Sequence, residues 1–216
     1  MNYKKNLMVY GYNGKLGSKI CKFGEEYNYN IIKLKRNLSN LKELENCVIV
    51  DVTCVDGTSY LLDKLLENKI NLPLIIGTTG NFNNLETKIN KYETQKDLLI
   101  KSFYKNPVLK ISNFSYGIPE IEKILEKFDL NIWKVKIKEI HHIHKKDAPS
   151  GTAKTLANVC LYDCNNIESI REGDTFGIHE INLSTEDEEI IITHKAKNRD
   201  IFAKGVFRFI EKLLIN

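Results

Sequence analysis

A short polar segment in the second half of the chain carries the side chains best suited to acid–base chemistry. Three of the five histidines, His141, His142 and His144, fall within four residues, and Lys145 and Lys146 follow them directly. A histidine can donate a proton near neutral pH, and the neighbouring lysines add fixed positive charge. The segment therefore predicts a site that binds an anion and protonates it.

The residues after this segment predict the start of an anion-binding helix. Pro149 interrupts regular structure, and Ser150, Gly151 and Thr152 open a run whose apolar residues recur at helical spacing. Backbone N–H groups at a helix start suit a carboxylate or phosphate, and a glycine allows close approach. Taken alone, the same residues are equally typical of a solvated histidine loop followed by ordinary turn and cap chemistry.

The composition predicts an ordinary globular protein of the cytoplasm. The chain has 216 residues, of which 42% are hydrophobic and 28% charged, enough for one compact or two small domains. The N-terminus lacks the apolar stretch of a signal peptide, and no apolar run approaches the roughly 20 residues of a membrane span. Five irregularly placed cysteines indicate reduced thiols, and a scattered net charge of +4 predicts no nucleic-acid surface.

No metal is expected at the histidine segment. Its pattern, His-His-x-His, has no CxxC companion to complete a zinc site.

The first half of the chain alternates short apolar strands with helical patterns. This alternation predicts a Rossmann-like, doubly wound parallel sheet, which binds ligands at the carboxyl ends of its strands. The predicted strands are residues 7–10, 31–34, 47–52 and 72–76, and the predicted helices are residues 18–27, 58–68 and 83–95.

Three loops follow predicted strands at the edge where such a sheet binds ligands. The first, residues 11–17, spaces its glycines G-x-x-G-x-x-G between a strand and a helix, an order typical of dinucleotide sites. Its turn would bring the backbone close to a pyrophosphate at a helix N-terminus. Residues 77–80 and 112–115 form two more small, hydrogen-bonding loops, so all three together predict a dinucleotide cofactor.

Two cations at the end of the second strand bear on the choice of cofactor. Lys35 stands 18 residues after Gly17, and Arg36 follows it. An acidic residue there would bind the ribose hydroxyls of NAD, whereas cations accommodate the 2′-phosphate of NADP. The pair favours NADPH over NADH, unless both residues are ordinary surface charges.

The second half predicts a smaller α+β domain with an open mixed sheet. Residues 133–140, 178–183 and 189–193 alternate like half-buried strands, and the helix from Ser150 is expected on one face of their sheet. The other face needs a partner, which predicts an oligomer. A final amphipathic helix, residues 201–214, is expected to return to the first domain. The predicted domains are residues 1–114 with 200–216, for dinucleotide binding, and residues 115–199, for substrate binding and oligomerisation.

Together these motifs resemble a shortened form of the 4-hydroxy-tetrahydrodipicolinate (dihydrodipicolinate) reductase family, over essentially the whole chain. Residues 139–153, EIHHIHKKDAPSGTA, are similar to the family pattern E-x-H-H-x-x-K-x-D-A-P-S-G-T-A. Shorter family motifs are resembled at residues 11–17, 51–53, 77–80, 113–115, 171–179 and 193–205. The chain departs from the family in a short connection between its second and third strands, a long stretch between residues 80 and 113, and a missing loop before Arg171.

The resemblance implies reduction of 4-hydroxy-tetrahydrodipicolinate to tetrahydrodipicolinate with NADPH or NADH, in diaminopimelate and lysine biosynthesis, by a homotetramer. It implies that His141 donates the proton, that Lys145 is a second donor and cation, and that His142 contacts substrate. Gly151 and Thr152 would bind a substrate carboxylate.

The resemblance also implies a dinucleotide site, with Lys35 and Arg36 at the adenosine ribose. Two alternatives stay open: another two-domain dehydrogenase of an amino-acid pathway, and a non-catalytic dinucleotide-binding sensor. The presence of His141 and Lys145 disfavours the sensor. The implied cofactor-binding residues are Gly11, Tyr12, Asn13, Gly14, Lys15, Leu16, Lys35, Arg36, Gly77, Thr78, Thr79, Ser112, Asn113 and Phe114.

Overall fold

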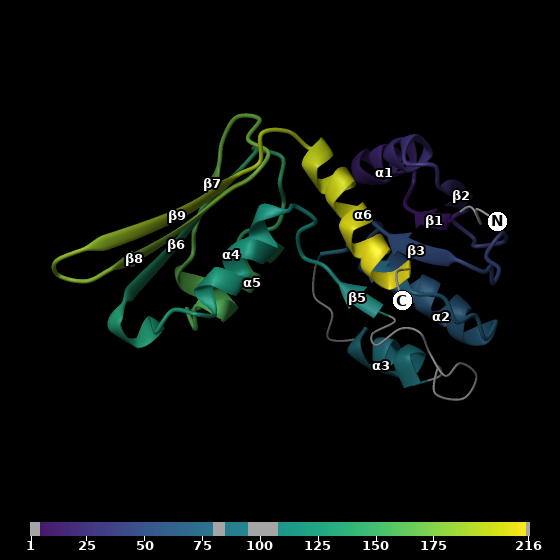
Figure 1. Ribbon diagram of the computed structural model, residues 1–216, viewed down its shortest axis with the longest axis horizontal. Helices are drawn as coiled ribbons and strands as arrows, with labels where there is room; N and C mark the ends of the chain where they lie inside the picture. The colour runs from purple at the N-terminus through teal and green to yellow at the C-terminus, as the bar shows by residue number, and fades with distance from the viewer. Residues whose placement is uncertain (1–4, 80–84, 95–107, 215–216) are drawn as a thin grey trace. The chain divides into compact units, whose positions relative to one another are not determined.

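The computed structural model describes residues 5–79, 85–94 and 108–214, and the chain divides into two compact units. Unit 1 comprises Met1–Ile111 and Phe202–Asn216, and unit 2 comprises Ser112–Ile201. Each unit has its own sheet, as the labels in Figure 1 show. Among the described residues, none of the helices is long and apolar enough to span a membrane.

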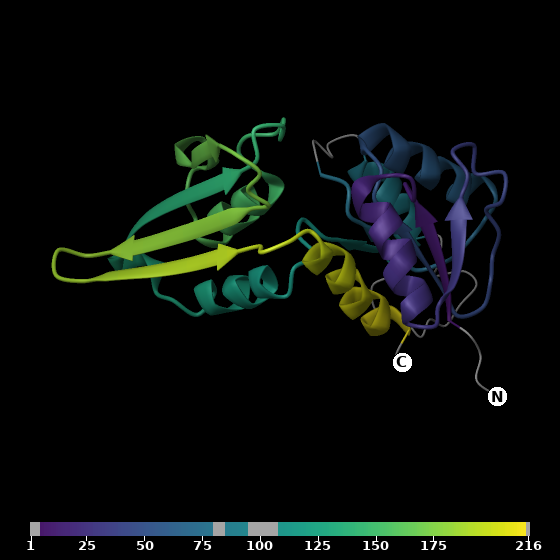
Figure 2. The ribbon, with the colours of Figure 1, turned by 90° about the horizontal axis from the view of Figure 1, so that it is seen from above.

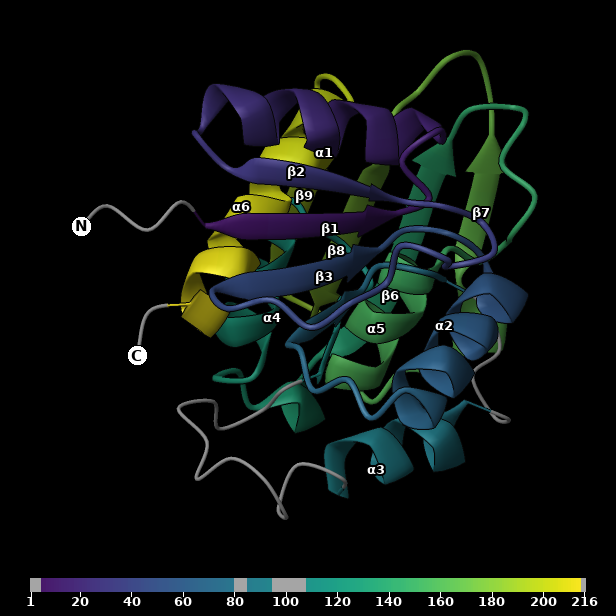
Figure 3. The same cartoon turned by 90° about the vertical axis from the view of Figure 1, so that its right-hand side faces the viewer.

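Unit 1 is built on a five-stranded parallel sheet, which confirms the predicted doubly wound fold. The strand order β2-β1-β3-β4-β5 places the switch point between β1 and β3, and Figure 3 shows β2, β1 and β3 side by side. All residues of β3 are buried, as expected for a strand covered on both faces. The strands are β1 (Asn6–Tyr10), β2 (Asn30–Leu34), β3 (Cys47–Asp51), β4 (Leu74–Ile76) and β5 (Val108–Lys110).

Helices cover both faces of this sheet. Figures 2 and 3 show α1 (Lys15–Glu26) and α6 (Asp200–Leu214) on one face, with α2 (Val55–Glu67) and α3 (Glu86–Thr94) on the other. The rings of Tyr27 and Phe207 meet edge to face at 4.9 Å between centroids, where the end of α1 lies against α6. The final helix was predicted to return to the first domain, and α6 packs in unit 1.

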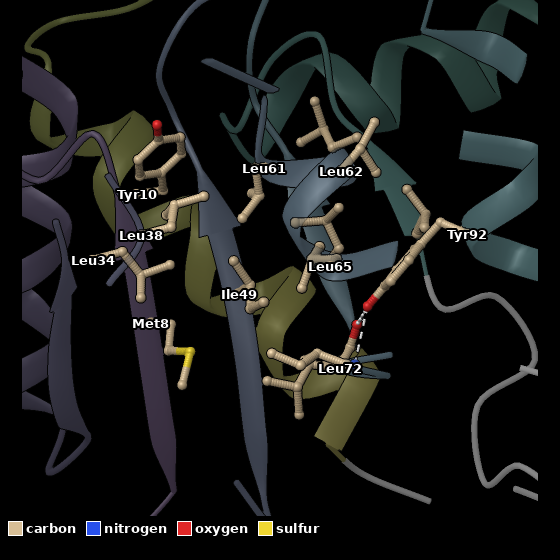
Figure 4. Close-up of a cluster of buried hydrophobic side chains, with 14 of the residues drawn as sticks. Met8, Tyr10, Leu34, Leu38, Ile49, Leu61, Leu62, Leu65, Leu72 and Tyr92 are labelled. Carbon is tan, nitrogen blue, oxygen red and sulfur yellow. Dashed lines mark hydrogen bonds between the residues drawn. The ribbon is translucent and has the colours of Figure 1, made fainter. Parts of the chain in front are cut away.

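A core of unit 1 lies between the sheet and helices α2 and α3 (Figure 4). Met8 and Ile49 point from the sheet toward Leu65 of α2, and all three are fully buried. Tyr92 of α3 is also fully buried, and its hydroxyl donates to the carbonyl of Leu72 at 2.6 Å and accepts from the N–H of Leu72 at 3.0 Å. These two bonds satisfy the only polar group of the side chain, so its burial stabilises the core.

Unit 2 contains the predicted mixed sheet, in the order β7-β6-β8-β9. Strand β7 pairs parallel to β6, and the other pairings are antiparallel. Helices α4 (Gly117–Leu125) and α5 (Gly151–Val159) cover one face, as Figure 1 shows. The strands are β6 (Lys134–His141), β7 (Glu168–Arg171), β8 (Ile178–Ser184) and β9 (Glu189–Lys195), with short 3₁₀ turns η2 (Leu130–Ile132) and η3 (Cys164–Asn166).

Several boundaries differ from those predicted. Helix α1 begins at Lys15, three residues earlier than predicted, because Gly14 is its N-cap and the glycine loop runs directly into the helix. Helix α2 begins at Val55 rather than at residue 58. The helix predicted over residues 83–95 is α3, Glu86–Thr94, and both predicted ends lie outside the described residues.

Candidate active site

A row of polar side chains crosses the helix-covered face of the unit 2 sheet. Strand register places Glu139 of β6 opposite His179 of β8, and His179 opposite His194 of β9. Two residues away on the same strands, Ile137 and Ile181 belong to the apolar core. Because side chains on one face of a strand recur every second residue, the polar row continues the core face beyond its apolar part.

Glu139 is the centre of the hydrogen bonding in this row. Its side chain is fully buried and accepts from Nδ1 of His141, from Nη2 of Arg171 at 2.7 Å and from the backbone N–H of Ser150 at 3.4 Å. Burial raises the pKa of Glu139, but the hydrogen bonds from His141 and Arg171 outweigh this effect and bring the pKa down to about 2. The carboxylate is therefore ionised at neutral pH.

His141 has one ring nitrogen engaged and one available for chemistry. Nδ1 bonds to Glu139, which leaves Nε2 as the atom that can transfer a proton. The space beside Nε2 depends on Gly177, because a Cβ at that position would lie 3.0 Å from this nitrogen. The arrangement suits a general acid whose orientation is fixed by a carboxylate.

His179 is a neutral neighbour of His141. Its ring lies 5.2 Å from that of His141, and its side chain is almost fully buried. Burial, followed by the nearby charge of His141, lowers the pKa of His179 to about 3. Nε2 of His179 lies 3.3 Å from Oγ of Ser150, so the ring supports the start of α5.

The start of α5 is capped as predicted. Oγ of Ser150 accepts from the N–H of Ala153 at 3.2 Å, and the N–H groups of Gly151 and Thr152 belong to the first turn, where a helix offers no internal acceptor. The hydroxyl of Thr152 accepts from Nδ2 of Asn113 at 3.0 Å. The helix therefore presents backbone donors close to the buried polar row.

Ser112, Asn113 and Phe114 lie in unit 2, although the sequence prediction placed them at the end of the first domain. Oγ of Ser112 accepts from the hydroxyl of Thr155 at 3.2 Å, so this loop and α5 are directly linked. The side chain of Phe114 is buried.

The lysine and histidine next to the acid hold defined positions. Nζ of Lys145 lies 2.7 and 2.9 Å from the two carboxylate oxygens of Asp147. Nδ1 of His142 is buried and has no hydrogen-bond partner among the described residues. Burial and the charge of Arg199 lower the pKa of His142, so this ring is neutral and can bind a ligand through a hydrogen bond.

The polar row and His141 also form a set of potential metal ligands. Donor atoms of Glu139, His141 and His179 lie within 4.8 Å of one another. However, one oxygen of Glu139 is bonded to His141 and the other to the Arg171 guanidinium, which already balances the carboxylate charge. A dication there would have to displace one of these partners, so the donor set fits a hydrogen-bonded acid–base network better than a metal centre.

Unit 1 contains a cavity of about 660 Å³ at the carboxyl ends of β1 and β3. Gly11 has a φ of +90°, and a Cβ on it would lie 2.8 Å from the carbonyl oxygen of Val52. A Cβ on Gly17 would overlap the carbonyl oxygen of Gly11, so the loop closes only with glycines. The lining residues are Tyr10, Gly11, Tyr12, Asn13, Gly14, Leu34, Arg36, Thr53, Cys54, Asp56, Gly57 and Tyr60.

The predicted cofactor residues of unit 1 fall into two groups. Gly11 to Gly14 and Arg36 line the cavity. Lys35, the residue before Arg36, is exposed and does not line the cavity. Lys15 and Leu16 form the first turn of α1. Gly77 and Thr79 follow β4, and the predicted turn residue Gly80 lies outside the described residues.

A buried hydrogen-bond chain supports the loop after β4. The hydroxyl of Thr58 lies 3.0 Å from the hydroxyl of Thr78 and donates to Oδ2 of Asp51 at 2.5 Å. Burial raises the pKa of Asp51, although hydrogen bonds from Thr53 and Thr58 lower it in part. The carboxyl end of β3 is thereby tied to the G-T-T loop.

Sequence reasoning assigned no role to Glu139, Arg171, His179 or Gly177. Glu139 lies two residues before His141 in an alternating strand, so a shared face was foreseeable from the sequence. Arg171 lies in β7, His179 lies in β8 and Gly177 directly precedes β8, so their position beside His141 depends on strand pairing.

Comparison with known proteins gives a consistent picture. Residues 117–216 match the family described as "Dihydrodipicolinate reductase, C-terminus". The chain is 32% identical to the 4-hydroxy-tetrahydrodipicolinate reductase of Staphylococcus epidermidis, over 97% of this chain and 95% of that protein. It is 31% identical to the corresponding enzyme of Nitratiruptor sp., over 94% and 91%.

Among solved structures, the fold is similar to that of a dipicolinate-bound dihydrodipicolinate reductase from Paenisporosarcina sp. TG-14. The TM-score is 0.70 at 21% identity, over 97% of this chain and 95% of that one. The near-complete coverage of relatives at about 30% identity leads to one conclusion: the chain belongs to the 4-hydroxy-tetrahydrodipicolinate reductase family.

Proposed function

We propose that this protein reduces 4-hydroxy-tetrahydrodipicolinate to tetrahydrodipicolinate with NADPH or NADH, as a step of diaminopimelate and lysine biosynthesis. The observation that carries the proposal is the pairing of a carboxylate-oriented acid, His141, with the N-terminus of α5 in one site, within a chain that matches one of these reductases over 97% of its length. The protein is an NAD(P)H-dependent oxidoreductase.

The residues of unit 1 fit a dinucleotide cofactor. The glycine loop closes so tightly that backbone N–H groups and the start of α1 can approach a pyrophosphate, and the adjoining cavity offers about 660 Å³. Gly11 to Gly14 would hold the phosphates, and Arg36 would meet the adenosine ribose. When bound, the reduced nicotinamide supplies the hydride.

The residues of unit 2 fit a substrate with two carboxylates. The N–H groups of Gly151 and Thr152, which have no acceptor within the helix, would bind one carboxylate at the positive end of α5. Lys145 lies in the loop that leads to α5. Its present partner Asp147 would give way to a substrate anion or share the cation with it. His142 would donate or accept a hydrogen bond through its unpartnered Nδ1.

His141 supplies the proton that the reduction needs. The 4-hydroxyl group of the substrate leaves as water, which gives an unsaturated ring. Protonated His141 then donates from Nε2 to the ring carbon next to the one that receives the hydride, and becomes neutral. The remaining Nδ1–H stays bonded to Glu139, so the ring keeps its orientation before and after the transfer. Lys145 acts as a second donor and stabilises negative charge on the substrate.

We further propose that the protein is a cytoplasmic homotetramer. Its five cysteines, all in the described part of the chain, are free thiols, as in a reducing compartment. In unit 2, α4 and α5 cover one face of the sheet, and the opposite face carries Ile191 at 53% exposure. The uncovered sheet face, rather than this residue alone, supports association of subunits through the sheet.

The test is an assay of the purified protein with substrate made in situ by the preceding synthase. Oxidation of NADPH and NADH is followed by absorbance, with product identified by mass spectrometry. Synthase-dependent oxidation that yields tetrahydrodipicolinate is expected. Absence of this reaction with both cofactors would refute the proposal and favour a non-catalytic dinucleotide-binding sensor.

A further inference from the structure

The proton donor and the anion-binding helix are bonded to the same side chain. One oxygen of Glu139 accepts from Nδ1 of His141, and the other accepts from the backbone N–H of Ser150, the N-cap of α5. Any change in this carboxylate therefore acts on the acid and on the helix start together.

Arg171 extends the connection to the loop that carries Lys145. Its Nη2 donates to Oε1 of Glu139 at 2.7 Å and to the carbonyl oxygen of Asp147 at 2.5 Å. The Asp147 side chain in turn holds the ammonium group of Lys145. Parallel pairing of β7 with β6 puts Arg171 directly opposite His141, which explains how a residue so distant in sequence reaches the site.

The charges around Glu139 nearly balance. Arg171 from β7 and Lys145 from the loop are cationic, Glu139 and Asp147 are anionic, and His179 from β8 is held neutral by burial. A fully buried carboxylate is destabilising unless it is paired. Glu139 is fully buried and accepts hydrogen bonds from three donors, which indicates that its carboxylate has a function in the site.

We propose that Glu139 is a positioning residue for the reduction, which holds His141 with a proton on Nδ1 and fixes the start of α5 beside it, while Arg171 supplies the compensating charge. The inference rests on the proposed function, in which His141 donates its proton from Nε2. A buried carboxylate bonded to Nδ1 orients a catalytic imidazole and stabilises its protonated form.

The first test is the pH dependence of turnover in Glu139→Gln. The amide nitrogen of glutamine would face Nδ1 of His141 as a donor, so the ring loses its partner for the protonated form. We expect kcat to fall on the order of 10²-fold, and the alkaline limb of the pH profile to move to lower pH. Glu120→Gln, which removes an exposed carboxylate of α4 that pairs with Lys123, should leave both unchanged.

The second test separates positioning from folding. Glu139→Gln leaves Arg171 buried without its counter-ion, which by itself can destabilise unit 2. The double variant Glu139→Gln with Arg171→Gln removes both charges and should recover thermal stability. It should still show the turnover loss and the shifted alkaline limb. A double variant with wild-type turnover and pH profile would overturn the proposal, because it would show that the ion pair serves folding alone.

The third test does not depend on turnover. Nitrogen-15 NMR of the histidine rings reports which nitrogen of neutral His141 carries the proton. We expect Nδ1–H in the wild type and a change toward Nε2–H in Glu139→Gln. The same tautomer in both proteins would overturn the inference, whereas an inactive wild type whose tautomer still depends on Glu139 would refute only the proposed function.

Discussion

Gly177 lies against His141 so closely that a single methyl group on Gly177 would come within 3.0 Å of Nε2, the nitrogen to which we assign proton donation. The glycine has a φ of +137°, a conformation that other residues rarely adopt. The turn before β8 thus keeps the acid accessible.

Gly177→Ala is expected to lower turnover at least about 10-fold, because the methyl group both strains the backbone and crowds the donor nitrogen. Steady-state kinetics and NADPH binding are measured together, and cofactor binding should be retained. The matched control is Gly173→Ala. Gly173 also has a positive φ, +50°, but a Cβ there would have no atom of the described residues within 4 Å. Equal turnover losses in the two variants would argue that backbone strain, rather than crowding of His141, is responsible.

The burial of neutral His179 predicts a loss of stability in mild acid. Its pKa is lowered from 6.5 to about 3, so below pH 6.5 the unfolded chain takes up a proton that the folded chain does not. This contribution to the free energy of unfolding is fully present above pH 6.5 and is lost progressively down to about pH 3. Between pH 7.5 and 5 it amounts to about 2 kcal/mol.

Urea unfolding of the wild type and of His179→Gln at pH 7.5 and pH 5 measures this contribution. The variant should show a smaller loss of stability between the two pH values. His144→Gln, which changes an exposed histidine, is the control and should behave like the wild type. An unchanged pH dependence in His179→Gln would show that other groups cause the acid sensitivity.

Substitutions at and before the start of α5 are expected to affect substrate recognition and turnover separately. Lys145→Ala combined with Thr152→Val should raise the substrate KM by about 10-fold or more, because a charge-assisted contact is worth roughly 1.5–3 kcal/mol. Thr152→Val also breaks the bond to Asn113, and Lys145→Ala should in addition lower kcat. Lys154→Ala removes an exposed lysine further along the same helix and serves as the control. A wild-type KM in the double variant would contradict the carboxylate-binding role.

The cavity in unit 1 refines the expectation for the cofactor. Arg36 lines the cavity and Lys35 does not, so Arg36→Ala should cost NADPH about 10-fold in affinity while NADH binding changes little. Lys35→Ala should have a smaller effect, which salt would screen further. Fluorescence titration of both cofactors decides this, with the exposed Lys33→Ala as the control. Equal losses for NADPH and NADH in Arg36→Ala would show that specificity is set elsewhere.

The parts of the fold that the sequence predicted best are those with strong periodicity. Strands β1 and β3 and the long helix α6 follow clear apolar patterns, and their existence and type agree with the structure. Helix α4 and strand β7 were not predicted. The strand has only four residues, too few to show alternation, and α4 has no side-chain cap at Tyr116 to mark its start.

The residues of the site also differ in how far the sequence could predict their proximity. His141, Lys145 and Gly151 lie in one continuous motif, so their proximity follows from local sequence. Arg171 and Gly177 reach His141 only because β7 and β8 both pair with β6, and single-sequence periodicity gives no strand order or register. The tertiary contacts that orient the acid could therefore not be predicted from the motif that contains it.

The central claim is that His141 is the proton donor of a reductase, and His141→Gln tests it most directly. Glutamine keeps a hydrogen-bonding side chain but cannot donate a proton in the same way, so kcat should fall on the order of 10²–10⁴-fold. The Kd of the unreactive analogue dipicolinate, measured by calorimetry, should change far less. A variant with wild-type kcat would contradict the claim, and so would a loss of turnover fully matched by a loss of analogue binding.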